Sequence, residues 1–142
     1  MKRASNILLT IGWILGIIGF IAFIISAIAY AIGGASCLVA AKQALAEATT
    51  EEGIAKANAI SIGGYVFISL SIFFLLSSPL YILAYVFARK GKTTLLSAKT
   101  RSEARPMAIT NIVFGALTSI YPLIVAGVLM LIINDERYQT SL

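Results

Sequence analysis

The chain has 142 residues, of which 59% are hydrophobic and only 12% are charged, and its net charge at pH 7 is +5. Soluble domains carry about 25% charged residues, so this composition excludes an ordinary globular protein. The charges are also segregated, since residues 4–41, 57–88 and 106–134 contain none. Each of these runs exceeds the roughly 20 residues that a membrane-spanning helix needs. The sequence therefore predicts an all-α integral membrane protein with three transmembrane helices, because at this composition only helices satisfy every backbone polar group in lipid.

The first apolar run predicts a transmembrane helix at about residues 7–32. It is more than twice as long as the apolar core of a cleaved signal peptide, which argues against its removal. The stretch before Cys37 loosely resembles a lipoprotein cleavage site, but it has Gly34 where an aliphatic residue is expected. We interpret Cys37 as a small buried thiol, and one cysteine cannot form an internal disulfide.

Residues 33–62 are predicted to form a helical hairpin on the outer side of the membrane. Thr49 and Glu52 have the spacing of a capping box, and Glu52 and Lys56 form a favourable i,i+4 pair. We expect helices over about 5–47 and 50–90 around a tight turn near 48–50. At the rise of an α-helix, this long antiparallel hairpin would extend roughly 20 Å beyond the bilayer.

Two Gly-Gly pairs, one in each helix of the hairpin, predict a close approach of two backbones. Small residues recur every seven positions along both helices, and small residues drive helix association in lipid. Antiparallel pairing about the turn then places Gly33 against Gly64 and Ser26 against Ser71. The alternative is that the glycines break the helices into a flexible outer loop. The predicted helix-packing residues are Gly12, Gly16, Gly19, Ser26, Gly33, Gly64, Ser71, Ser78 and Gly115.

The remaining segments are a second span at about residues 63–88, a basic loop at 89–105 and a third span at about 107–133, with Pro106 in its first turn. The N-terminus carries a charge of +2 and the basic loop +5, whereas residues 42–56 and the C-terminal tail carry −1 each. Lys and Arg in short loops stay in the cytoplasm. This alternation predicts a multi-pass protein with its N-terminus and basic loop in the cytoplasm and its C-terminus outside.

The sequence offers little catalytic chemistry, because it has no His and no Asp, Glu, Lys or Arg within the predicted spans. Intramembrane charges mark proton and ion pathways, so their absence argues against a pump. The carboxylates outside the spans form no recognisable catalytic or metal arrangement, and Val86 replaces the first glycine of a phosphate-binding loop that would end at Gly91-Lys92-Thr93. We therefore expect no enzyme activity, cofactor or metal, and no nucleic acid partner, because no soluble basic face exists.

The basic segment has the charge to hold anionic lipid head groups. The alternative is that these charges only fix the orientation of the chain in the membrane. The residues concerned are Arg89, Lys90, Lys92, Lys99, Arg101 and Arg105.

Three stretches carry a resemblance to known proteins: residues 104–117, with Arg105-Pro106-Met107 and a later Gly115-Ala116-Leu117, residues 126–132, and residues 11–19. Together they resemble small glycine-rich multi-span membrane proteins of unknown function from Gram-positive bacteria and their wall-less relatives. This resemblance implies a bacterial plasma membrane and no particular activity.

The function that these observations favour is that of a non-enzymatic accessory or scaffolding subunit of a larger membrane complex. Residues 35–41 and 53–62 contain one charge, Lys56, yet are expected outside the bilayer, and exposed apolar surface of that kind marks an interface. The partners would be the lipid bilayer and other membrane subunits or further copies of the chain. The alternatives are a self-assembling, holin-like pore and a small oligomeric transporter, although a pore needs a polar stripe along its lumen.

Overall fold

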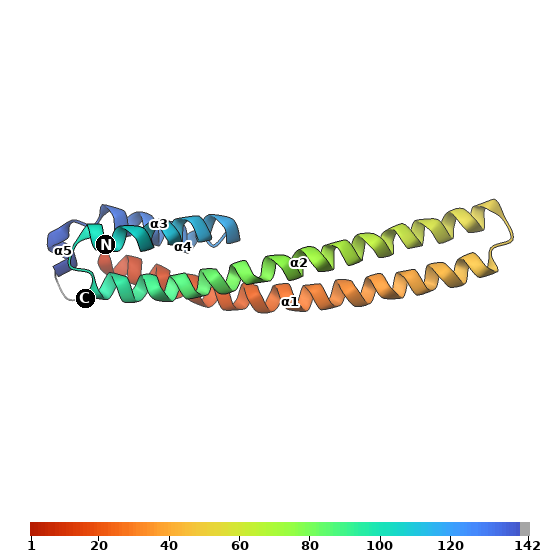
Figure 1. Cartoon of the computed structure of the whole chain (residues 1–142), viewed down its shortest axis with the longest axis horizontal. Coiled ribbons are helices and arrows are strands. Elements are labelled where there is room, and N and C mark those ends of the chain that lie inside the picture. The colour runs from red at the N-terminus through yellow and green to blue at the C-terminus, as the bar shows by residue number, and fades with distance from the viewer. Residues whose placement is uncertain (140–142) are drawn as a thin grey trace. The chain divides into compact units, whose positions relative to one another are not determined.

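The computed structural model describes residues 1–139, and every secondary-structure element within them is an α-helix (Figure 1). The helices are α1 (Lys2–Glu47), α2 (Glu51–Ser97), α3 (Arg101–Thr118), α4 (Tyr121–Ile132) and a short α5 (Asp135–Gln139). The predicted all-α class is confirmed. The chain divides into two compact units, a terminal unit formed by Met1–Phe20 with the chain from Pro79 onward, and a middle unit formed by Ile21–Ser78.

Helices α1 and α2 are each long and apolar enough to cross a membrane. They contain 46 and 47 residues, more than twice the roughly 20 that a span requires. Only 17% of the most apolar stretch of α1 and 11% of that of α2 is buried. The apolar core helix of a soluble protein would be buried instead, so these exposed apolar surfaces favour contact with lipid.

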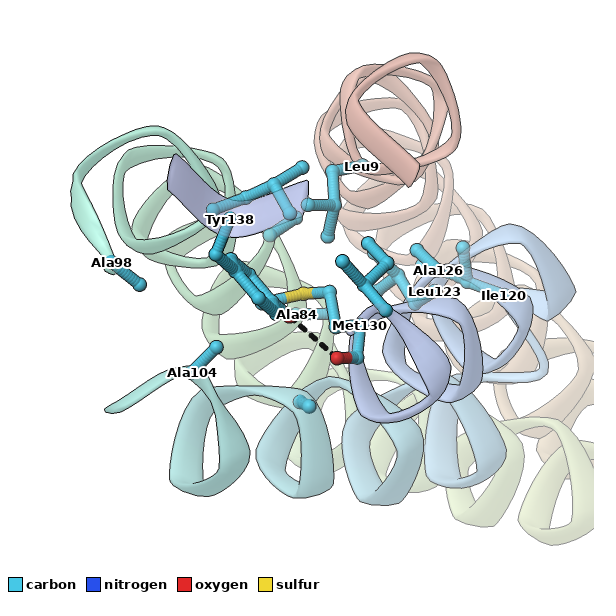
Figure 2. Packing of buried hydrophobic residues seen from close by; sticks show 13 residues of the cluster. Leu9, Ala84, Ala98, Ala104, Ile120, Leu123, Ala126, Met130 and Tyr138 are labelled. Carbon is cyan, nitrogen blue, oxygen red and sulfur yellow. Dashed lines mark hydrogen bonds between the residues drawn. The ribbon is translucent and has the colours of Figure 1, made fainter. Parts of the chain in front are cut away.

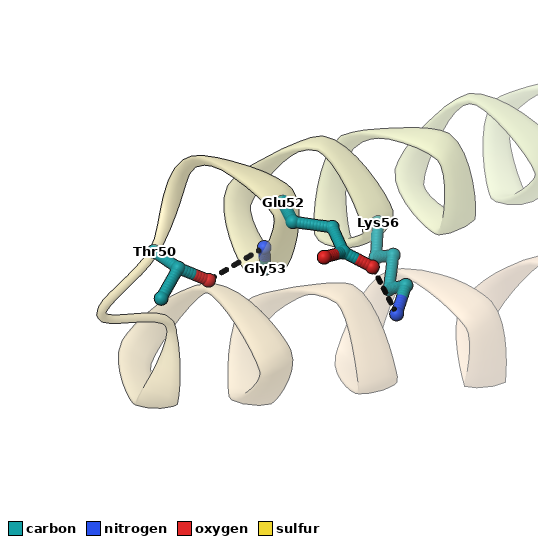
Figure 3. A network of polar contacts seen from close by, with 4 residues as sticks. All are labelled: Thr50, Glu52, Gly53 and Lys56. Atoms are coloured by element: carbon teal, nitrogen blue, oxygen red, sulfur yellow. Dashed lines mark hydrogen bonds and ion pairs between the residues drawn. The ribbon is translucent and has the colours of Figure 1, made fainter.

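In the middle unit, α1 and α2 run antiparallel on either side of a turn at residues 48–50 (Figure 1). Thr50 caps the N-terminus of α2, because its Oγ1 accepts a hydrogen bond of 3.2 Å from the backbone N–H of Gly53 (Figure 3). The capping residue is therefore Thr50 and not Thr49. The predicted pair of Glu52 and Lys56 is present at 2.9 Å, although an exposed pair of this kind stabilises a helix only slightly.

In the terminal unit, the segment expected to be one helix over residues 107–133 consists of two helices packed side by side. Helix α3 ends where Ser119 adopts a left-handed conformation with φ of 56°, which is uncommon outside glycine and ends the helix. The N–H of Ser119 donates to the carbonyl of Ala116, and Pro122 then lies in the first turn of α4. The chain reverses here because the αL conformation of Ser119 ends α3, and Pro122 is compatible with the first turn of the new helix that starts at Tyr121.

The helices α3 and α4 are antiparallel and in close contact. A Cβ added at Gly127 would lie 2.5 Å from the carbonyl oxygen of Ala108, so the two backbones nearly touch. At the opposite end of the pair, the backbone N–H of Arg101 donates to the Asp135 carboxylate at 2.6 Å. The start of α3 and the residues after α4 therefore lie at the same end of the terminal unit.

Buried residues of the terminal unit form one core to which all five helices contribute (Figure 2). Along α3 the buried positions are spaced alternately three and four residues apart, as expected for one face of a helix. Many of them are small, which permits close helix packing. The core includes Leu9, Ala84, Ala88, Leu95, Ala104, Ala108, Leu123, Ala126, Met130, Ile133 and Tyr138.

The segment predicted as a basic loop over residues 89–105 is mostly helical. Helix α2 continues to Ser97, and only residues 98–100 link it to α3. Thr100 is the N-cap of α3 and accepts a hydrogen bond from the N–H of Glu103. As α3 begins at Arg101, Pro106 lies beyond the first turn in which it was predicted.

Candidate functional site

The buried residues of the middle unit form a seam of small side chains between α1 and α2. On α1 the buried positions are Ala27, Gly34 and Ala41, and on α2 they include Ala57, Gly64 and Ser78, with Ser71 half-buried between the last two. Both series repeat every seven residues, the spacing that keeps one face of each helix toward the other. We call this surface the small-residue seam.

Gly34 and Gly64 mark the closest approach within the seam. A Cβ added at Gly34 would lie 2.9 Å from the carbonyl oxygen of Gly64, and one added at Gly64 would lie 3.1 Å from that of Gly34. Two turns away, the hydroxyl of Ser71 donates a hydrogen bond of 2.7 Å to the backbone carbonyl of Ala27. These contacts align the two helices by backbone proximity and by an interhelical hydrogen bond.

The register differs by one residue from the predicted one. Gly34 lies against Gly64, whereas Gly33 is half-buried beside the ring of Phe67. The hydroxyl of Ser71 bonds Ala27 and not Ser26, which is half-buried. In sequence both members of a Gly-Gly pair fit a small-residue pattern, and only the direction in which each points in the folded helix separates them.

Aromatic rings occupy the space beside the seam. Phe23 meets Phe74 edge to face at 5.1 Å, and Tyr30 stacks on the same Phe74 at 5.4 Å. Ring pairs of this geometry add to the energy of burial. The aromatic residues thus fill the gap that the small residues leave, so the seam combines close backbones with bulky flanks.

The other predicted packing glycines lie in the terminal unit. Gly16 faces the backbone of Tyr85, where an added Cβ would lie 3.0 Å from its nitrogen, and Gly19 faces the Tyr81 ring. Gly12 instead faces Leu123 of α4, and Gly115 faces the nitrogen of Ile124 at 2.9 Å from an added Cβ. Ser78, at the boundary of the middle unit, donates to the carbonyl of Leu75 in its own helix.

The six predicted lipid-binding residues all lie in the terminal unit, but they do not form one surface. Arg101 and Arg105 line a cavity of about 650 Å³ with Asn134 and Asp135, between α3 and the residues after α4. Arg89 and Lys92 line a second cavity of about 210 Å³ between α1 and α2. Lys90 and Lys99 are exposed and line neither cavity.

The residues after α4 are attached to the terminal unit by Tyr138, which the sequence pattern did not single out. Its ring is buried, its hydroxyl donates to the carbonyl of Met130, and its own carbonyl accepts from Lys2 at 3.0 Å (Figure 2). Burial raises the pKa of the Tyr138 phenol above its ordinary value of 10.0, while Arg101 opposes this shift and Asp135 adds to it.

Two polar side chains, Ser5 and Asn111, are fully buried in the terminal unit. Ser5 is buried and donates to the carbonyl of Ala126 at 3.2 Å. Asn111 is fully buried; its amide nitrogen donates to Met107, and its Oδ1 has no partner in the described chain. A Cβ added at Gly91 would lie 2.5 Å from the Asn111 amide nitrogen, so Gly91 serves close packing against α3.

Residues 1–139 hold no group of three His, Cys, Asp or Glu side chains that could bind a metal ion. Cys37 is a half-buried free thiol. No protein family matches the chain, and neither a curated protein nor a solved structure does.

Substituting Gly34 by Ala should weaken the middle unit, because the new methyl group meets a backbone carbonyl that cannot move aside. We expect a loss of about 1–3 kcal/mol in unfolding free energy, as for other overpacked contacts. Unfolding in mixed micelles with increasing sodium dodecyl sulfate, followed by circular dichroism, measures the change.

Gly63→Ala is the matched control for this substitution. A Cβ at Gly63 meets no described atom within 4 Å, and alanine is a better helix former than glycine by about 1 kcal/mol. This variant should be as stable as the wild type or more stable. Equal destabilisation by both substitutions would show that the seam is not where the helices touch.

The attachment of α5 should weaken in alkaline solution. The buried Tyr138 keeps its proton while the detached phenol loses it near 10.0, so raising the pH through and above this value favours the detached state. In a spectrophotometric titration of tyrosinate, the wild type should show a component above pH 10 that Tyr138→Phe lacks. A difference curve centred at or below the ordinary value would contradict burial of this ring.

Proposed function

We propose that this protein is a non-enzymatic accessory or scaffolding subunit of a larger membrane protein complex in a bacterial plasma membrane. The observation that carries the proposal is the exposure of large apolar side chains on the part of the middle unit that surrounds the turn. Val39 is 57% exposed and Ile62 64%, and Leu45 and Ile54 are also exposed. The small-residue seam accounts for this pattern, because it turns the small side chains inward and leaves the large ones outside.

Charge argues that this same region lies in water and not in lipid. Residues 42–56 carry five charged side chains, and charges within the hydrocarbon are costly. We propose that α1 and α2 cross the bilayer and that residues 33–62 continue beyond its outer face. Exposed apolar side chains in water mark a surface that another protein covers.

The pair α3–α4 changes the proposed topology. Helix α4 has 12 residues, which correspond to about 18 Å at the rise of an α-helix, whereas the hydrocarbon is about 30 Å thick. We propose that α3 enters the membrane, reverses at Ser119 and returns through α4 without crossing. The C-terminus would then lie in the cytoplasm, in place of the outside location predicted from a single third span.

The distribution of charge supports this topology. Nine of the eleven Lys and Arg residues would then lie on the cytoplasmic side, and only Lys42 and Lys56 outside. The positive-inside rule favours such an arrangement. The hydrogen bond between Arg101 and Asp135 also supports it, since it joins the segments before α3 and after α4.

The alternative of a pore formed by identical copies receives less support. A lumen needs polar groups directed into it. Two of the exposed serines of the middle unit, Ser36 and Ser69, donate their hydroxyls to carbonyls four residues earlier in their own helices. These residues therefore offer fewer free donors to a water column than the sequence suggests.

The topology can be tested with single cysteines in a Cys37→Ser background. A cysteine replacing Glu136 should react with a membrane-impermeant thiol reagent only after the cells are opened, because the C-terminal residues are in the cytoplasm. A cysteine replacing Glu51 should react in intact cells. Labelling of both positions in intact cells would restore a third crossing and contradict the re-entrant pair.

The accessory role can be tested by purification in a mild detergent and mass spectrometry of the chains that accompany the protein. We expect a stoichiometric foreign subunit with the wild type, and its loss when Val39 and Ile62 are both replaced by Lys. These side chains are exposed, so the variant should keep its helical circular dichroism spectrum.

Gln43→Lys is the control, since it adds charge at an exposed polar position of the same helix. This variant should retain the foreign subunit. A ring of identical chains, or ion flux through liposomes that contain only this protein, would contradict the accessory role and favour a pore.

A further inference from the structure

We propose that the terminal unit binds one anionic phospholipid in a groove between α1 and α2. Two cavities define this groove, a polar one lined by Thr10, Trp13, Arg89 and Lys92 among others, and an apolar one lined by Gly16, Ile17, Phe20, Ile82 and Tyr85. The inference depends on the proposed membrane placement but not on a protein partner.

The two cavities lie along the same faces of the two helices. On α1 the lining residues Thr10, Trp13, Ile17 and Phe20 follow one another at intervals of three or four, and on α2 Lys92, Arg89, Tyr85 and Ile82 do the same. Residues at these intervals share one face of a helix. The two cavities therefore follow one line along the helices, with Arg89 and Lys92 at one end and only apolar surface at the other.

The polar end of the groove carries two cationic side chains, Arg89 and Lys92. No ion pair is found for Arg89 or Lys92 among the described residues, and Lys92 donates to the Thr10 hydroxyl at 3.2 Å. The indole nitrogen of Trp13 is buried beside the Tyr85 ring, which stacks on Trp13 at 5.9 Å, and the Tyr85 hydroxyl interacts with both Trp13 and Arg89. No carboxylate is paired with Arg89 or Lys92 among the described residues, so a phosphate would supply the negative charge that this end of the groove lacks.

The position of the groove fits a lipid with its phosphate at the cytoplasmic interface. Trp and Tyr favour the level of the head groups, and here Trp13 and Tyr85 stand between the cationic and the apolar cavity. The apolar cavity measures about 180 Å³ and is lined by Gly16, Ile17 and Phe20 of α1 together with Ile82 and Tyr85 of α2. An acyl chain would lie along this surface while the phosphate contacts Arg89 and Lys92.

The test is a titration of the purified full chain in a neutral detergent with phosphatidylglycerol or phosphatidylcholine, read by native mass spectrometry. Phosphatidylglycerol should bind at one copy per chain and more tightly than phosphatidylcholine. Replacing both Arg89 and Lys92 by Gln should weaken its binding by about tenfold or more. Ile82→Trp, which fills the apolar cavity without changing charge, should also weaken it.

The double variant Lys90→Gln with Lys99→Gln removes the same charge from residues outside the groove and should bind the lipid as the wild type does. Equal loss in both double variants would overturn the site in favour of general charge attraction. Displacement of the lipid by inorganic phosphate alone, or an unchanged affinity in Ile82→Trp, would show that no acyl chain is bound. Neither result bears on the thiol labelling that tests the topology.

Discussion

The fold depends on the close approach of helix backbones through residues that lack bulky side chains. In lipid there is no hydrophobic force to hold two apolar helices together, so contact must come from packing and interhelical hydrogen bonds. Gly34 and Gly64 provide this contact in the middle unit, and Gly127 against Ala108 provides it between α3 and α4. Because the interior is filled by small residues, the large apolar side chains remain at the surface, where they are available to lipid and to other proteins.

One residue conformation determines how the C-terminal third is arranged. Ser119, with its positive φ, ends α3. Helix α4 then starts at Tyr121, with Pro122 in its first turn, and its 12 residues are too few to cross a bilayer. The reversal brings the residues after α4 back to the start of α3, where Asp135 accepts a hydrogen bond from Arg101, while Tyr138 attaches α5 to α4 and α1. Cationic side chains of this unit line two separate cavities.

The proposed functions rest on two surfaces of the protein. The described residues contain no catalytic arrangement, but they include an apolar surface near the turn and a groove with cations at one end. Under the proposed membrane placement, the first surface suits a protein partner, because apolar residues exposed to water commonly mark an interface. The second suits the proposed lipid, because its cationic and its apolar lining residues follow the same faces of α1 and α2. The two surfaces belong to different units and can be altered independently.

The sequence by itself determined the helical class, the two long apolar helices, the turn near residue 49 and the pair of Glu52 and Lys56, because each follows from local composition and spacing. It also indicated a small-residue seam, since a seven-residue repeat is visible along the chain. Only the tertiary structure decided that Gly34 and not Gly33 faces Gly64, because both neighbours fit the pattern and the direction of each Cα–Cβ bond depends on how the helices meet. The reversal at Ser119 and the alignment of Trp13, Arg89 and Lys92 were likewise decided by packing, since each depends on residues far apart in the chain coming together around a shared core.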